Sequence, residues 1–492
     1  MNNLESSKTT PKPNNTILYY LSKTAFGLFL IYLFVLPFER RHIFNVDQAN
    51  LDGNFVEWLS ISFYGSDLIL LTLIFIFTLI LGIKLVKGEI IQSGIIHSRP
   101  LFGASLALIV LSLASIACLD FSGQLLGFIK LLRLMAALSI FFYIIDQVRT
   151  KKLVVLTFGA LILSGIFQAG VAIFQFATQK SLQLKIFGEI DLAPEITNIA
   201  KIVVDNSRLI RPVGTLPHAN VLAIFLLIAI FACLFCILYT QNSGEAVDNS
   251  TRRGIMLHVE RLKQKYLNIA LLICLLFITL VFVLTLSRIA LACLVVDLVA
   301  LVIVNVKFSK KGRWDNFLKV LISQLVLLAV VGLILWPLMQ NRLGVQDKDG
   351  DMALSNRLHY NQEATEMIIA SPFLGVGLGN SIPTLMNRSP DQETWQYQPV
   401  HNLYLLVTTE IGLLGFFIFA LILIIVSRNV LEIPLCKGKN MNILLLSGLL
   451  LGTLLIVACF DHYFWTINQS FFLFWIVLGL LLASSRMERE RY

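Results

Sequence analysis

Charged residues are scarce in this chain. Only 14% of its 492 residues are Asp, Glu, Lys or Arg, whereas 57% are hydrophobic, and the mean hydropathy is +0.79. A soluble domain of this length needs far more polar surface to meet water, so the composition excludes one. Apolar runs of the ~20 residues that cross a bilayer recur throughout, and they predict an all-α polytopic membrane protein with about twelve transmembrane helices.

Several chemical motifs are also missing. The seven cysteines lie in apolar runs or, for Cys436, in a predicted cytoplasmic loop, so no disulfide framework is expected. Cys233 and Cys236 form a CxxC pair inside a predicted span, which we interpret as packing. The sequence has no glycine-rich nucleotide loop, no acidic metal cluster and no interleaved basic and aromatic residues. It therefore predicts no metal, no cofactor and no nucleic-acid partner.

The basic residues predict the orientation in the membrane. The net charge is +9, and lysine and arginine fall mostly in short loops on alternate sides of the predicted spans, as the positive-inside rule requires. The first apolar run is long enough to span and lacks a cleavage site, so it is interpreted as a helix. An even number of spans with both termini in the cytoplasm follows. We predict a cytoplasmic, disordered tail over 1–16, one transmembrane domain over 17–485, and a cytoplasmic tail over 486–492.

The long polar loop before the tenth span, 339–400, is predicted to be extracytoplasmic. Within it, 352–370 has the pattern of an amphipathic helix at the membrane interface. Gly375, Gly377 and Gly379 follow, and either a ligand-approaching turn or a structural re-entrant turn explains them. The predicted spans are 17–38, 67–86, 100–119, 124–146, 153–177, 217–239, 267–286, 288–306, 317–338, 401–426, 442–460 and 466–485.

Polar side chains gather at the predicted outer ends of these spans. A lone histidine at a helix start is usually a cap or an interface residue. His401, however, follows a flexible loop and faces cations, and a neutral imidazole accepts a proton near pH 7. We therefore interpret His401 as the chemical centre. The other residues predicted at this depth are Arg211, His218, Arg288, Asp461 and His462.

Two further sets of polar residues lie at membrane depth. Lys130 and Arg133 are one turn apart, roughly 9–14 Å inside the outer end of their span. Such cations cost ~2.5–3.5 kcal/mol each, so they form an anion site, or else snorkel or pair with an acid such as Asp297. Glu410 is nine residues after His401, about 180° around and some 13 Å deeper in a straight helix, so it is expected to anchor another helix. Gly412 and Gly415 would permit close helix packing.

Short motifs in the second half of the chain resemble the O-antigen ligase and O-antigen polymerase superfamily of bacterial polysaccharide assembly. Each motif is loose, but their order and spacing together are specific, and they cover most of the chain from the fifth span onward. They are 211–220 (RPVGTLPHAN), 284–288 (LTLSR), 371–379 (SPFLGVGLG), and His401-Asn402 followed by 410–415 (EIGLLG).

The resemblance implies a metal-independent, inverting glycosyltransferase with a GT-C-type fold in the bacterial inner membrane. The donor would be a glycan on undecaprenyl diphosphate, and the acceptor a glycan, lipid or protein. His401 would be the general base, and Arg211 and Arg288, with Arg357 as a third, would bind the diphosphate. Arginines with no acidic metal cluster suit that role by charge and bidentate hydrogen bonding, and Lys130 and Arg133 are added to them. Supporting positions are His218, Asn220, Asn402, Glu410, Asp461 and His462.

Three functions remain open from the sequence. A ligase moves finished chains to an acceptor and a polymerase joins repeat units, and the motifs favour the ligase only slightly. A transporter is the third, because Gln168 and Gln175 inside a predicted span would suit a transport path. The chain lacks the internal repeats and paired broken segments of many transporters, which argues against transport.

Overall fold

A computed structural model gives the arrangement of most of the chain. It describes residues 13–46, 49–51, 53–89, 94, 98–117, 119–196, 199–204, 207–244, 254–308, 315–343, 348–431 and 441–489. The fold is an all-α polytopic bundle, 77% helical, as the composition predicts.

Within the described residues, eleven helices are long and apolar enough to cross a membrane, and the apolar segment Ile443–Ala458 is shorter. Eleven of the predicted spans thus contain a helix of membrane-crossing length, and the predicted span 442–460 contains the shorter one. The eleven long helices are α1 (Pro13–Val35), α2 (Gly65–Val86), α3 (Arg99–Ala117), α4 (Phe121–Gln147), α5 (Lys151–Thr178), α6 (Ala219–Gly244), α7 (Gly254–Leu284), α8 (Arg288–Phe308), α9 (Asp315–Ile334), α13 (Leu403–Leu431) and α16 (Asn468–Arg489), and the shorter one is α14 (Met441–Ala458).

The boundaries differ from the predicted tails at both ends. Helix α1 begins at Pro13, so 13–16 are helical, and the rest of the predicted N-terminal tail lies outside the described residues. Helix α16 continues to Arg489, beyond the predicted end of the transmembrane domain.

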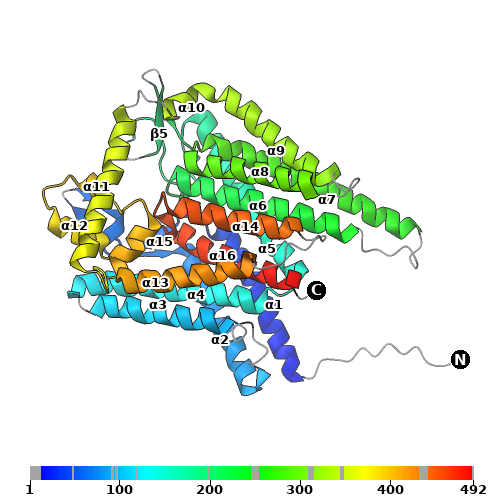
Figure 1. Cartoon of the computed structure of the whole chain (residues 1–492), viewed down its shortest axis with the longest axis horizontal. Coiled ribbons are helices and arrows are strands. Elements are labelled where there is room, and N and C mark those ends of the chain that lie inside the picture. Colours follow the sequence, from blue (N-terminus) through cyan, green and yellow to red (C-terminus); the bar gives the residue numbers. More distant parts are fainter. Residues whose placement is uncertain are drawn as a thin grey trace.

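Helix α6 forms the centre of the bundle. Its spanning segment is buried along its whole length, and α5, α7, α8 and α14 pack around it (Figure 1). A helix that is apolar on every side needs neighbours on every side, which explains this position. Helix α2, in contrast, is mostly exposed and lies at the edge, where its leucines would face lipid.

The predicted long loop contains α11 (Lys348–Ala370) and α12 (Ser381–Arg388), while α10 (Trp336–Leu343) begins within the last residues of the predicted ninth span. The prediction of a helix over 352–370 is thus confirmed. Helices α11 and α12 lie across one end of the bundle, which we call the α11 end (Figure 1). A loop after α1 reaches the same end, where its Trp58 packs against Ile382 and Leu385 of α12.

The loops contain short antiparallel strands, which were not predicted from the sequence. Strand β1 (Arg41–Ile43) pairs with β4 (Ser62–Tyr64), β2 (Asn50–Leu51) with β3 (Asn54–Phe55), and β5 (Lys201–Val204) with β6 (Ser207–Ile210). The loops also contain the one-turn helices η1 (Glu57–Leu59), η4 (Lys185–Phe187), η5 (Thr394–Gln396) and α15 (Tyr463–Thr466).

Helix α13 is broken at Gly412, which has φ 69° and ψ −178°. The straight helix assumed from the sequence is therefore wrong beyond Ile411. The break frees backbone groups inside an apolar bundle, where each unpaired group is costly. A loop over 372–377 pairs with them: Val376 and Gly377 donate to the Thr409 and Glu410 carbonyls at 2.8 and 3.0 Å, and Leu413 donates to the Pro372 carbonyl at 2.8 Å.

Gly375 of this loop and the nearby Gly379 each pack closely against other parts of the chain. A Cβ atom on Gly375 would lie 2.5 Å from the Thr409 carbonyl oxygen, and one on Gly379 would lie 2.9 Å from the Lys130 side chain. Of the two explanations left open by the sequence, the structural re-entrant turn is the one that matches these contacts.

We expect Gly412→Ala to lower the free energy of unfolding by about 1–3 kcal/mol or more, because this backbone conformation is open almost only to glycine. A Cβ atom there would also lie 2.1 Å from the Phe373 carbonyl oxygen. Thermal unfolding in detergent measures the loss. Gly332→Ala in α9 is the matched control, since its Cβ would meet nothing within 4 Å; equal melting of the two variants would contradict the account.

Candidate active site

Three of the sequence-predicted residues converge at the α11 end of the bundle. His401 precedes α13, while Asp461 and His462 lie between α14 and α15. One nitrogen or oxygen from each lies within 4.8 Å of the other two. The imidazole rings of His401 and His462 are 4.9 Å apart and nearly perpendicular. We call these three residues the His-Asp-His cluster.

Hydrogen bonds hold this cluster in place. Asp461 Oδ1 accepts from the backbone N–H of His462 at 2.9 Å, and Asp461 Oδ2 accepts from Asn220 Nδ2 at 3.4 Å. His462 Nδ1 is 2.7 Å from Thr466 Oγ1, one turn later. Nδ1 of His401 is buried and makes no hydrogen bond of normal geometry with the residues described.

Aromatic rings cover the cluster on two sides, and sequence reasoning missed both. Tyr360 of α11 stacks on His401, with ring centroids 6.1 Å apart and planes at 15°. Trp58 of η1 meets the His462 ring edge-on at 5.4 Å. Each ring comes from a different element than the imidazole that it meets, and Trp58 lies near the other end of the chain from His462, so no local pattern pointed to them. They limit the access of water to the imidazoles.

Burial determines the charge state of the cluster. It lowers the pKa of His401, and Arg357 lowers it further, while the nearby Asp461 carboxylate opposes both. Burial also lowers the pKa of His462 well below its usual value and raises the pKa of Asp461. Because the pKa of His401 is below its usual value, the ring is neutral at pH 7 and becomes charged only as the pH falls further. A neutral imidazole is the form that accepts a proton.

The cationic and amide residues predicted nearby have different surroundings. Arg357 is half-buried and within electrostatic range of all three members of the cluster. His218 is exposed, and its Nδ1 accepts from the Asn220 backbone N–H at 3.1 Å. Arg288 is exposed at the start of α8 and has no ion pair within the described part of the chain. Asn402 caps α13 through hydrogen bonds to the backbone of Tyr404 and Leu405.

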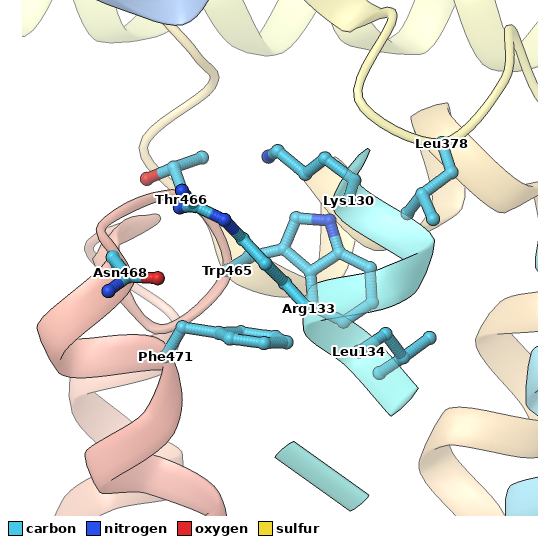
Figure 2. Close-up of a pocket in the computed structure, with 8 residues that line it drawn as sticks. All are labelled: Lys130, Arg133, Leu134, Leu378, Trp465, Thr466, Asn468 and Phe471. Carbon is cyan, nitrogen blue, oxygen red and sulfur yellow. The ribbon is translucent and has the colours of Figure 1, made fainter. Parts of the chain in front are cut away.

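Lys130 and Arg133 line a pocket of about 330 Å³, counting the open space at its mouth. Figure 2 shows both side chains reaching from α4 toward Thr466 and Asn468. Thr466 therefore joins this cationic pocket to the His-Asp-His cluster through its contact with His462. Arg133 also donates to the Ser62 carbonyl at 2.6 Å.

Two buried carboxylates, Asp297 and Glu410, could have been the acidic partners of Lys130 and Arg133. Asp297, the partner suggested from the sequence, instead accepts a 2.5 Å hydrogen bond from Thr453. Glu410 is the acid within electrostatic range of Lys130. It is 1% exposed and accepts hydrogen bonds from Ser381 Oγ at 2.9 Å and Trp465 Nε1 at 2.8 Å. Glu410 thus fastens α13 to α12 and to the turn that carries His462.

Arg211 lies apart from the cationic pocket. Its side chain is 2% exposed, and the guanidinium donates to the Thr285 carbonyl and to Asn220 Oδ1, both at 2.8 Å. Of the predicted diphosphate ligands, the structure brings Lys130 and Arg133 together in a pocket, and Arg357 beside the cluster.

The cluster also has the spacing of a metal site, since three ligand atoms lie within 4.8 Å. Its donors, however, are already occupied in part: both Asp461 oxygens accept hydrogen bonds, and His462 Nδ1 contacts Thr466. Arg357 adds positive charge nearby. Hydrogen bonds of this kind also support metal ligands, so these contacts are compatible with a divalent cation as well as with a proton-accepting group.

The fold and the site define a polytopic membrane protein with a half-buried histidine-carboxylate cluster at one end of its bundle. Residues 272–420 match the family model described as O-antigen ligase, and this match supports membership of the O-antigen ligase superfamily. The matched region contains Arg288, Arg357, His401 and Glu410, whereas Arg211 and the other two members of the cluster lie outside it. No curated protein matches the chain.

Proposed function

We propose that this protein transfers a glycan from undecaprenyl diphosphate to an acceptor hydroxyl at the extracytoplasmic face of the bacterial inner membrane, in the manner of an O-antigen ligase. The single observation that carries the proposal is the half-buried His401 beside Asp461, at the same end of the bundle as a cationic pocket. The family match supports an activity in polysaccharide assembly.

In the proposed reaction, His401 takes the proton of the acceptor hydroxyl as its oxygen attacks the anomeric carbon of the donor sugar. The bond between that carbon and the diphosphate oxygen breaks in the same step, and the diphosphate leaves with the electron pair. A single displacement inverts the configuration at carbon. Asp461, within 4.8 Å of His401, would stabilise the imidazolium that forms.

The departing diphosphate carries negative charge that the enzyme must stabilise. Lys130 and Arg133 line a pocket suited to that charge, Arg357 faces the cluster, and Arg288 is exposed at the start of α8. Cations held in a low-dielectric site act more strongly than cations in water. Fixed positive charge would thus replace the divalent ion that many sugar transfers need, and we propose a metal-independent reaction.

A transport function loses its main support. Gln168 and Gln175, which suited a transport path in the sequence, instead bind the backbone around Gly214 and Thr215. Their amides are therefore committed to holding a loop. The break in α13 is likewise filled by the 372–377 loop.

Loss of the base should stop transfer. We expect His401→Ala to lower transfer by about 10²-fold or more, the usual contribution of a general base. In cells that lack the gene, or carry His401→Ala, finished long chains should accumulate on the lipid carrier. His42→Ala, an exposed histidine of β1, is the matched control. Accumulation of single repeat units would indicate a polymerase, and an unchanged pool would remove His401 from the mechanism.

Loss of a diphosphate-binding cation should weaken donor binding. We expect Arg288→Gln and Lys130→Gln each to raise the Kd for undecaprenyl diphosphate about 10- to 100-fold, the usual value of a charge-assisted hydrogen bond. Binding is measured on the protein in lipid nanodiscs. Lys263→Gln, an exposed cation of α7, should bind like the wild type. Unchanged affinity in both test variants would contradict the assigned roles.

Removal of divalent cations should leave the reaction intact. Purified protein treated with EDTA is expected to transfer glycan at the untreated rate, because the leaving group is neutralised by side chains. The measurement compares initial rates before and after chelation, with added Mg²⁺ or Mn²⁺ as the reverse test. A loss of activity that either ion restores would show that the His-Asp-His cluster, or another site, needs a metal.

A further inference from the structure

One side chain of the cationic pocket has unused hydrogen-bonding groups. Asn468, the first residue of α16, is 3% exposed, and neither its Oδ1 nor its Nδ2 makes a hydrogen bond of normal geometry with the described residues. Asp67 of α2 lies within range of this amide, but the hydrogen bond that its carboxylate accepts comes from the Tyr64 N–H at 2.9 Å. An unpartnered buried amide destabilises the folded protein, so its presence calls for an explanation.

The position of Asn468 in the pocket separates it from its neighbours. Gln469 and Ser470, the next residues of α16, are also buried and each has one unpartnered atom. Neither of them lines the pocket, whereas Asn468 does. Figure 2 shows the amide oxygen of Asn468 turned to the side on which Trp465 and Arg133 lie. The unused acceptor is therefore available to a molecule that enters the pocket.

The apolar walls of the pocket suit a sugar ring. Trp465 and Phe471 contribute aromatic rings, with centroids 6.0 Å apart and planes at 84°. The Trp465 Nε1 group is already bonded to Glu410 at 2.8 Å, so its ring contributes apolar surface. Apolar walls with a few well-placed polar groups are typical of small-molecule sites. A sugar offers such a site both C–H faces, which pack on aromatic rings, and hydroxyls, which hydrogen-bond.

The chemistry of the amide distinguishes a sugar from a diphosphate. An ionised diphosphate has acceptors only, so it would leave Oδ1 of Asn468 unpaired and facing negative charge. Lys130 and Arg133 supply donors and positive charge in the same pocket, and neither donates to Oδ1 in the structure. A sugar hydroxyl or amide N–H is the donor that Oδ1 lacks. In a carrier-linked glycan the first sugar is bonded directly to the diphosphate, so both would reach this pocket together.

We propose that Asn468 recognises the sugar next to the diphosphate, through a hydrogen bond that Oδ1 accepts from a hydroxyl or amide N–H of that sugar. The inference rests on the proposed function, since it names the part of the donor that this residue binds. Lys130 and Arg133 act on the charge of the diphosphate, and Asn468 selects the sugar. Thr466, two residues before Asn468, contacts His462, so a sugar held here lies beside the His-Asp-His cluster.

Asn468→Leu tests this role, because leucine is close to asparagine in size and has no polar side-chain atoms. The Kd of this variant for bare undecaprenyl diphosphate should equal that of the wild type. Its Kd for the carrier-linked glycan, extracted from cells that lack the gene, should rise about 10-fold, the usual value of one hydrogen bond. Both are measured in lipid nanodiscs. Without ligand the variant should melt at or above the wild-type temperature, since it no longer buries unpartnered groups.

Three further variants serve as controls. Ser470→Ala, which alters a buried unpartnered hydroxyl outside the pocket, should keep the wild-type Kd for both ligands. Asn380→Leu removes a buried amide that donates to the Gly123 and Leu378 carbonyls, each at 3.0 Å, and should lower the melting temperature. Asn468→Ala, which adds no atoms, should show the same difference between the two ligands as Asn468→Leu, and it carries the binding test if leucine does not fit.

The outcomes distinguish this inference from the proposed function. A rise in the Kd for bare undecaprenyl diphosphate in both Asn468 variants would make this residue a diphosphate ligand and overturn the inference. Wild-type Kd values for both ligands, whatever the melting temperature, would make the amide structural and overturn it also. In either case the proposed function stands if the wild-type protein binds both ligands. If the wild-type protein binds neither, the proposed function itself fails.

Discussion

The arrangement of the site depends on the pairing of backbone groups at the break in α13. An opened helix inside an apolar bundle is stable only if its free N–H and carbonyl groups find partners. The 372–377 loop supplies them, and this pairing brings Ser381 to Glu410. Glu410 then bonds Trp465, in the turn that begins at His462. A single constraint on the backbone thus connects the loop, the broken helix and the His-Asp-His cluster.

Two electrostatic environments lie next to each other at this end of the bundle. The first surrounds the imidazoles, where burial lowers the pKa of His401 while Tyr360 packs on His401 and Trp58 on His462. The second is cationic, around Lys130 and Arg133. Thr466 belongs to both. Proton transfer needs the first environment and a departing anion needs the second, so their proximity suits a displacement in which both occur in one step.

The family match covers 272–420, yet the site draws on the whole chain. Helix α4 supplies the two cations of the pocket, the 211–220 segment reaches Asp461 through Asn220, and the loop after α1 brings Trp58 to His462. The matched region therefore carries the proposed base, and the surrounding elements supply its environment.

The sequence by itself determined the class of fold and the positions of the spans. The length and apolarity that a segment needs to cross the hydrocarbon core are properties of that segment alone. The sequence also pointed to His401, Asp461 and His462, which the fold brings within 4.8 Å of one another. Tertiary structure alone decided that α13 breaks at Gly412, that Glu410 rather than Asp297 faces Lys130, and that Arg211 is buried. Each of these depends on partners far away in the chain, such as the 372–377 loop or Thr285, and the bonds that they form leave no local signal in the sequence.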